Sequence, residues 1–156
     1  MSKLDRLIAS NKQWAEKISQ ENPDFFKDLS KQQNPEYLWI GCSCQDLPAH
    51  QLVGVQSSQV LVHHNLGNMV LDTDMNLMAC LHHAIFDLNI RQVILCGHQK
   101  CNALAAALAG SASGVAESWM RKLHQIYEQH SAEFDPMDSQ EQRQEQLTRV
   151  NVAYQA

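Results

Sequence analysis

Three short apolar runs constrain the fold of this chain more than any other feature of its sequence. They are Tyr37 to Gly41, Gln59 to His63 and Gln92 to Cys96. Each has the length of a strand, and consecutive apolar residues are typical of strands that are buried on both faces. Between the second and third runs, residues 73–88 show apolar residues at helical spacing after Thr73, a candidate N-cap. Strands joined by a helical crossover predict a parallel-centred sheet flanked by helices, the α/β class.

Helical patterns lie on both sides of this predicted core. Residues 3–19 are amphipathic and follow Ser2, and a second short helix is expected after Pro23. The segment QEQRQEQ at 140–146 predicts a solvated helical face. We therefore expect a single domain with three parts: a helical arm (1–35), an α/β core (36–110) and C-terminal helices (111–156).

Composition narrows the class of protein further. The 156 residues carry 17 acidic and 12 basic side chains, a net charge of −5, and show no basic stripe, which argues against a nucleic-acid partner. No apolar run approaches the length of a membrane span, and the N-terminus lacks the features of a signal peptide. A cytoplasmic location is therefore expected. Five cysteines, an odd number in a reducing compartment, favour metal ligands or buried thiols over disulfides.

Two thiol-rich motifs follow the apolar runs. Cys42 comes directly after the first run, Cys96 ends the third, and His98 and Cys101 follow it. The carboxyl ends of parallel strands meet at one edge of a sheet, where ligands of α/β proteins bind. Cys and His are the ligands that Zn²⁺ prefers, and three of them with one open position make a catalytic site. The sequence therefore predicts a zinc site at this edge, whereas Cys80 is expected to be a buried apolar residue within a helix.

Four motifs together resemble the β-class carbonic anhydrases of bacterial type. They are LWIGCS at 38–43, the Pro48-Ala49 step, VHHNLGN at 62–68 and CGHQKC at 96–101. The resemblance covers residues 3 to about 154, nearly the whole chain. It implies a parallel-centred sheet with an N-terminal helical arm, and an active site formed at a dimer interface.

The resemblance also implies a reaction and the residues that carry it. Members of this family hydrate CO₂ reversibly to bicarbonate with a zinc-bound hydroxide, and hold one Zn²⁺ per chain at positions that correspond to Cys42, His98 and Cys101. Gln33 corresponds to a substrate-binding glutamine. Trp39 and His64 correspond to a bicarbonate pocket, in which the family has an arginine at the second position. A histidine there would bind an anion only when protonated, and a polar surface role is the alternative.

The motif after the first run departs from the family. Family members have an Asp-Arg dyad that orients the zinc-bound water, and those two positions are Cys44 and Asp46 here. Residues i and i+2 of an extended segment lie about 6.6 Å apart at Cα, close enough for two sulfurs to share one zinc. Cys44 would then close a Cys₃His site, or it would remain a neutral thiol beside a zinc ion that keeps its water.

These alternatives lead to different functions. The first is an active zinc carbonic anhydrase with an altered dyad. The second is an impaired or inactive homologue whose closed Cys₃His site is structural, in a structural or regulatory subunit. A third is a redox sensor in which Cys42 and Cys44 release zinc on oxidation. In each case a homodimer or higher oligomer is expected, because the resemblance implies a further strand beyond this chain, and a partner subunit would cover that edge.

Overall fold

The computed structural model describes residues 2–31 and 34–156. The chain divides into two compact units, Met1–Asn34 and Pro35–Ala156, and each is described by itself. The predicted arm ends within one residue of the boundary between these units. Whether the chain behaves as one domain stays a prediction.

The first unit consists of two helices. Helix α1 (Lys3–Glu21) begins at Ser2, whose side chain caps it as the sequence predicted. Helix α2 (Phe25–Lys31) packs an aromatic cluster against it, with the rings of Trp14 and Phe26 centred 5.9 Å apart, edge to face. No residue of α1 is buried, so its apolar stripe faces solvent in the isolated chain. The exposed apolar residues of this unit are Leu4, Leu7, Ile8, Trp14, Phe26 and Leu29.

The second unit is built on a three-stranded parallel sheet. Strands β1 (Tyr37–Cys42), β2 (Val60–Asn65) and β3 (Gln92–Cys96) lie in the order β2-β1-β3, within a residue or two of the predicted runs. The parallel α/β architecture is thereby confirmed. The prediction that all three strands are buried on both faces is wrong for β2 and β3, which are partly exposed. They form the two edges of the sheet in the described residues, and only the central strand β1 is enclosed.

Alternate residues of β1 face two different layers of helix. Leu38 and Ile40 pack with Leu77 of helix α4 (Met75–His82), whereas Trp39 packs with Ala49 of helix α3 (Ala49–Val53). Period-two alternation therefore operates even in this fully buried strand. Helix α4 continues into a π-helical turn, η2 (His83–Asp87).

The N-terminus of the crossover helix differs from its prediction. The N-cap of α4 is Asp74 rather than Thr73, because the Asp74 carboxylate accepts hydrogen bonds from the backbone N–H groups of Asn76 and Leu77. A carboxylate both satisfies these free donors and complements the positive end of the helix dipole.

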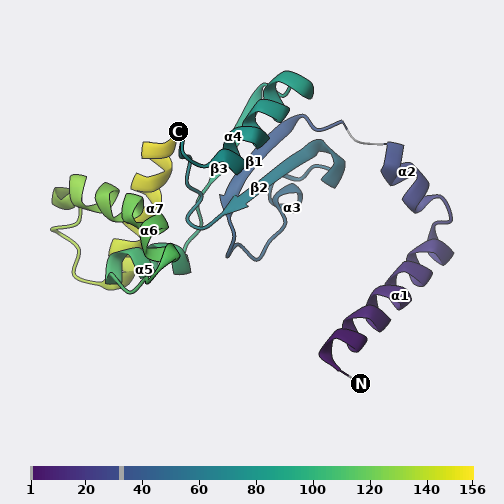
Figure 1. Ribbon diagram of the computed structural model, residues 1–156, viewed down its shortest axis with the longest axis horizontal. Coiled ribbons are helices and arrows are strands. Elements are labelled where there is room, and N and C mark those ends of the chain that lie inside the picture. The colour runs from purple at the N-terminus through teal and green to yellow at the C-terminus, as the bar shows by residue number, and fades with distance from the viewer. Residues whose placement is uncertain (1, 32–33) are drawn as a thin grey trace. The chain divides into compact units, whose positions relative to one another are not determined.

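Three further helices gather at the end of the sheet to which the strands point (Figure 1). They are α5 (Asn102–Ala109), α6 (Val115–Gln129) and α7 (Gln140–Gln155). Two short helical turns complete the unit: η1 (Ser57–Gln59) leads into β2, and η3 (Ser131–Glu133) lies between α6 and α7. Leu123 of α6 and Leu147 of α7 are fully buried in the core between these helices. The same core encloses Cys42 and Cys101, so the predicted metal ligands lie where the sheet meets the helical layer.

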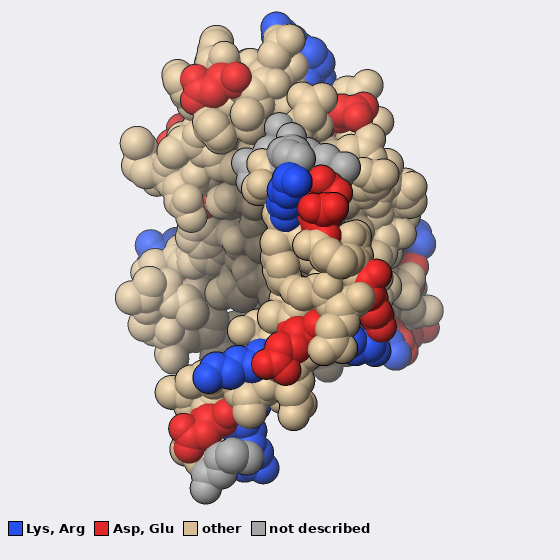
Figure 2. Space-filling model, turned by 90° about the vertical axis from the view of Figure 1, so that its right-hand side faces the viewer, with Lys and Arg blue, Asp and Glu red and all other residues tan. Residues whose placement is uncertain are grey.

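The surface carries charges of both signs. On the face drawn in Figure 2, acidic and basic side chains alternate, and neither sign forms a continuous patch among the described residues. None of the helices in the described part of the chain is long and apolar enough to cross a membrane.

Candidate metal centre

Four metal-binding side chains converge at the carboxyl edge of the sheet. Cys42, Cys44, His98 and Cys101 place one ligand atom each within 4.8 Å of all the others. The closest pairs are Cys44 Sγ with Cys42 Sγ and Cys44 Sγ with His98 Nε2, both 3.2 Å apart. Cys101 Sγ lies 3.6 Å from the sulfurs of Cys42 and Cys44. The structure thus brings together the two thiol-rich motifs, as the sequence predicted.

The spacing of these atoms fits a tetrahedral zinc site. Zinc bonds of about 2.3 Å to sulfur and about 2.0 Å to nitrogen place neighbouring ligand atoms about 3.5 to 3.8 Å apart. The two separations of 3.6 Å are of this size and the two of 3.2 Å are somewhat shorter. Three thiols with one imidazole form a donor set that structural zinc sites use. The residues present therefore fit a zinc ion, and Cys44 lies at the fourth corner of the cluster.

Strand β1 and the loop after β2 fix Cys42. The residue ends the central strand and is fully buried, so its sulfur has little freedom. Its Sγ accepts a hydrogen bond of 3.2 Å from the backbone N–H of Gly67. The side chain of Asn65 holds this loop through both backbone groups of Met69, at 2.7 and 2.8 Å. Sequence reasoning did not find this backbone donor, because a backbone N–H has no signature of its own.

The turn after β3 presents His98 and Cys101 together. Lys100 has a left-handed backbone with φ 54°, which turns the chain sharply before Cys101, the N-cap of α5. The ring of His98 lies with Nδ1 3.0 Å from the carbonyl of Gln99. Since a carbonyl only accepts, Nδ1 carries the proton, and the lone pair of Nε2 points into the cluster.

Helix α7 holds the ligand-bearing turn after β3 and the loop of Gly67 after β2 by hydrogen bonds. The Gln144 side chain donates to the carbonyl of Cys101 at 2.6 Å, and the Thr148 hydroxyl donates to the carbonyl of His98 at 3.5 Å. The buried Asn151 side chain donates to the carbonyl of Gly67 at 2.9 Å. The prediction that 140–146 forms only a solvated face is therefore wrong at Gln144, which is half-buried against the metal loop.

Hydrogen bonding within the cluster favours the thiolate form of Cys42. The pKa of Cys42 is lowered to about 4, chiefly by the hydrogen bond from the Cys101 thiol and further by backbone N–H groups, while burial opposes the shift. The pKa of Cys101 is raised, because that thiol donates to Cys42 and is itself buried. A preformed thiolate is the form of cysteine that binds metal ions.

The remaining cysteines lie outside the cluster. Cys96 ends β3, but its Sγ lies 3.3 Å from the carbonyl of Gly97 and packs near Trp39. Cys80 packs in the apolar layer around α4. Burial raises the pKa of both thiols, as expected for apolar surroundings.

The two residues at the altered dyad positions, Cys44 and Asp46, have different surroundings. Cys44 joins the cluster, whereas Asp46 is exposed and makes no side-chain hydrogen bond or ion pair among the residues described. Nothing therefore links these two positions as a dyad would. Gln33, the predicted substrate-binding residue, lies outside the described residues, and its role stays a prediction.

Trp39 and His64, the predicted bicarbonate pocket, lie around Gly41. A methyl group at Gly41 would lie 2.6 Å from Nε1 of Trp39 and 3.1 Å from both Cδ2 of His64 and Oε1 of Gln45. Trp39 Nε1 and Gln45 Oε1 are buried and have no hydrogen-bond partner in the described part of the chain. These three side chains therefore pack directly against Gly41, where no larger residue would fit, and they leave a buried donor and a buried acceptor unused.

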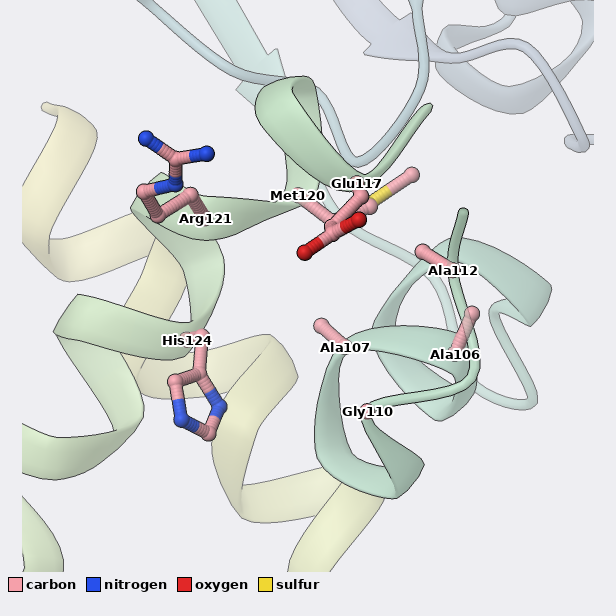
Figure 3. Close-up of a pocket in the computed structure, with 8 residues that line it drawn as sticks. All are labelled: Ala106, Ala107, Gly110, Ala112, Glu117, Met120, Arg121 and His124. Atoms are coloured by element: carbon pink, nitrogen blue, oxygen red, sulfur yellow. The ribbon is translucent and has the colours of Figure 1, made fainter. Parts of the chain in front are cut away.

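A separate pocket of about 240 Å³ lies between α5 and α6 (Figure 3). Alanines of α5 form one wall, and Glu117 extends from α6 towards the space beside them. The pocket contains none of the four clustered ligand residues, so it does not contribute to the metal centre.

Comparison with known proteins identifies the family to which this fold and cluster belong. Residues 37–156 match the family model described as carbonic anhydrase. The chain is 32% identical over 148 residues to a carbonic anhydrase of Emericella nidulans and 27% identical over 162 residues to one of Saccharomyces cerevisiae. These alignments cover 95% and 99% of this chain, but 65% and 73% of the two relatives.

Solved structures give the same assignment. A β-carbonic anhydrase of the ascomycete Sordaria macrospora, described as tetrameric, superposes with a TM-score of 0.87 at 34% identity, over 97% of this chain and 78% of that one. A β-carbonic anhydrase of Aspergillus fumigatus superposes with a TM-score of 0.83 at 35% identity, over 96% of this chain and 72% of the other. The match extends over the metal loops as well as the sheet, and the chain belongs to the β-carbonic anhydrase family.

Proposed function

We propose that this chain binds one zinc ion and catalyses the reversible hydration of CO₂ to bicarbonate. The observation that carries the proposal is the convergence of Cys42, His98 and Cys101 from two distant segments onto one point. Family membership supports the same reaction. Because the chain spans 65% of its Emericella relative, the activity is a proposal about this chain and not a property taken from the longer protein.

Each of the three residues would hold zinc through a donor that the fold has already oriented. Cys42 offers a buried sulfur that a backbone N–H supports, and His98 offers the free lone pair of Nε2. Cys101 offers a sulfur at the N-terminus of α5. When bound, zinc supplies the Lewis acidity that makes water a nucleophile near neutral pH.

The chain's own residues contribute less to orienting a nucleophile than a dyad would. Cys44 is directed to the cluster, and Asp46 remains in solvent without a partner in the described residues. Positioning of the reacting groups is a large part of enzymatic rate enhancement. We therefore expect a slower reaction than one assisted by an intact Asp-Arg dyad.

A second candidate function is favoured by the position of Cys44. Its sulfur lies 3.2 Å from a sulfur and a nitrogen of the other ligands, as expected for the fourth member of a closed Cys₃His site. A closed site has no open position for water and would be structural. The chain would then act as a structural or regulatory subunit.

The number of sulfurs on the metal separates the two functions. X-ray absorption of zinc-loaded protein would show two sulfurs, one nitrogen and one oxygen for the open site, or three sulfurs and one nitrogen for the closed site. Stopped-flow CO₂ hydration from pH 7 to 9 on the same sample tests catalysis directly. CO₂ hydration rates equal to those of buffer alone, in both wild type and Cys44→Ser, would reject the proposed reaction. Cys96→Ser is the matched control, because Cys96 lies outside the cluster.

We further propose that Trp39 and His64 bind bicarbonate beside Gly41 when His64 is protonated. The buried Nε1 of Trp39, which has no hydrogen-bond partner in the described residues, supports this proposal, as does the position of His64 beside the same glycine. Bicarbonate should change Trp39 fluorescence more at pH 6 than at pH 8, and Trp39→Phe should remove that difference. An equal response at both pH values would contradict the role of His64.

We also propose that copies of this chain associate with one another. The exposed apolar side chains of α1 support a homo-oligomer, as does the similarity to a β-carbonic anhydrase described as tetrameric. A monomer in analytical ultracentrifugation at micromolar concentration would reject self-association.

We also propose a cytoplasmic location, which the five free cysteines support. Cell fractionation would test it.

A further inference from the structure

We propose that Cys42 and Cys44 form a thiol switch: hydrogen peroxide joins their sulfurs in a disulfide, and the metal ion is released. This inference rests on the metal site of the proposed function, but it does not require CO₂ hydration. It assigns to the Cys-x-Cys motif a regulatory role that metal coordination alone would not give.

The two sulfurs are already the closest pair of thiols in the cluster. Cys42 Sγ and Cys44 Sγ lie 3.2 Å apart, whereas Cys101 lies 3.6 Å from each. A turn holds the pair together, because the backbone N–H of Gln45 donates to the carbonyl of Cys42 at 3.0 Å. A disulfide between residues i and i+2 therefore requires movement of this short turn and not of the sheet.

The three thiols differ in how far solvent reaches them. Cys42 and Cys101 are 0% and 1% exposed, whereas Cys44 is partly exposed. Cys44 also sits in a turn whose neighbours Ser43 and Asp46 are exposed. A small oxidant therefore reaches Cys44 first, and the buried thiols react with the product of that first step.

The chemistry balances with hydrogen peroxide as the oxidant. The Cys44 thiolate attacks one peroxide oxygen, the O–O bond breaks, and a sulfenic acid and hydroxide form. The Cys42 thiolate then attacks the sulfenic sulfur, the S–S bond forms, and a second hydroxide leaves. Two protons convert the hydroxides to water, so two thiolates lose two electrons to one peroxide. Two equivalents of a thiol reductant reverse the change.

The second step favours Cys42 over Cys101. Cys42 is the nearer sulfur, and the Gly67 N–H at 3.2 Å stabilises negative charge on it. A thiolate is the nucleophile in disulfide formation, and Cys42 is the thiolate nearest to the sulfur of Cys44, at 3.2 Å against 3.6 Å for Cys101.

Loss of these two thiolates removes the metal. A disulfide sulfur carries no negative charge and is a poor zinc ligand. The donor set therefore falls to the Cys101 thiolate and the His98 imidazole, whether zinc is first held by two thiolates or by three. Zinc binding requires deprotonated ligands in sufficient number, and two protein ligands do not make a stable site.

The test uses zinc-loaded, reduced protein in a Cys80→Ala background. Trypsin then yields Cys42 and Cys44 together on the peptide 32–91, Cys96 on 92–100 and Cys101 on 101–121. Peroxide should release the bound zinc, measured with a chromogenic chelator, as two thiols are lost. The 32–91 peptide should lose two hydrogens in mass without linking to another peptide, and dithiothreitol with added zinc should restore the metal.

Matched variants separate this inference from the proposed reaction. Cys44→Ser should keep its zinc under peroxide, whereas Cys96→Ser should release it like the parent protein. Zinc retention by the parent, or a link between the 32–91 and 101–121 peptides, would overturn the switch and leave CO₂ hydration unaffected. Protein that does not hydrate CO₂ but still releases its zinc under peroxide would reject only the proposed reaction. Reduced protein that binds no zinc would overturn both.

Discussion

The sulfur of Cys44 lies 3.2 Å from Nε2 of His98, although 54 positions separate the two residues in the chain. This contact connects the turn after β1 to the turn after β3. It places a third thiol in the metal centre, and so determines whether a bound zinc ion would have an open position.

Removing zinc is expected to destabilise the fold. A metal that binds only the folded chain contributes about 4 kcal/mol when its concentration is a thousand times its Kd. Chelation should therefore lower the melting temperature of wild type, measured by calorimetry. His98→Ala should bind zinc more weakly and melt at nearly the same temperature with or without chelator. Identical wild-type melting curves in both conditions would contradict a zinc site.

Gly97→Ala should loosen the metal centre. A methyl group at Gly97 would lie 2.9 Å from Cγ2 of Thr148 and of Val152, so α7 would have to shift. We expect a loss of about 1–3 kcal/mol, typical of overpacking, together with weaker zinc binding. Adding Val152→Ala should recover part of both losses. No rescue would mean that contact with α7 is not the cause.

Leu123→Ala should be among the most destabilising single changes. The side chain is fully buried and packs against Gly67, whose N–H supports Cys42. Removing it should cost about 2–5 kcal/mol in the free energy of unfolding, measured with urea. Val115→Ala, on the same helix but 89% exposed, should change stability by less than about 0.5 kcal/mol. Equal losses of stability in the two variants would contradict the buried position of Leu123.

Asp74→Ala should weaken the crossover helix. The carboxylate accepts two backbone N–H bonds at the start of α4, and loss of such a cap costs about 1 kcal/mol. Asp72→Ala provides the control, because Asp72 is exposed and caps no helix. Chemical denaturation of the two variants should therefore differ, and coincident curves would exclude the capping role.

Acid should weaken the contact between the turn η3 and α7. The His130 side chain, hydrogen-bonded at 2.8 Å, lowers the pKa of Glu133, and Gln146 of α7 also donates to this carboxylate. Because the folded pKa lies below the ordinary value of 4.5, the contribution is present above pH 4.5 and is lost as pH falls through the folded pKa. Denaturation midpoints of wild type and Glu133→Gln should therefore converge below that pH. A difference between the two midpoints that does not change with pH would contradict this role of Glu133.

Much of the fold could be predicted because strong local patterns coincide with it. The three apolar runs became strands, and Ser2 capped the first helix as expected. Burial of the edge strands was overestimated, because apolar composition does not reveal how many neighbours a strand has. The N-cap at Asp74 was missed because Thr73 and Asp74 are both good caps, and only backbone geometry decides between them.

The metal centre was predicted in part for similar reasons. Ligand type and spacing indicated the two thiol-rich motifs, and the resemblance to the β-carbonic anhydrases selected Cys42, His98 and Cys101 within them. The location of Cys44 was left open between two arrangements. The supporting donors were missed, because the Gly67 N–H and the Gln144 amide act through tertiary contacts between distant segments. Sequence spacing carries no information about such contacts.

Helix α7 contacts the loop of Gly67 through Asn151 and the loop of Cys101 through Gln144, and it follows both loops in the chain. During translation, the thiols therefore leave the ribosome before the helix that orders them has been made. The nascent chain exposes its sulfurs in an unorganised state, and the centre can mature only after residues 140–155 emerge. Metal acquisition in the cell would thus follow the synthesis of α7.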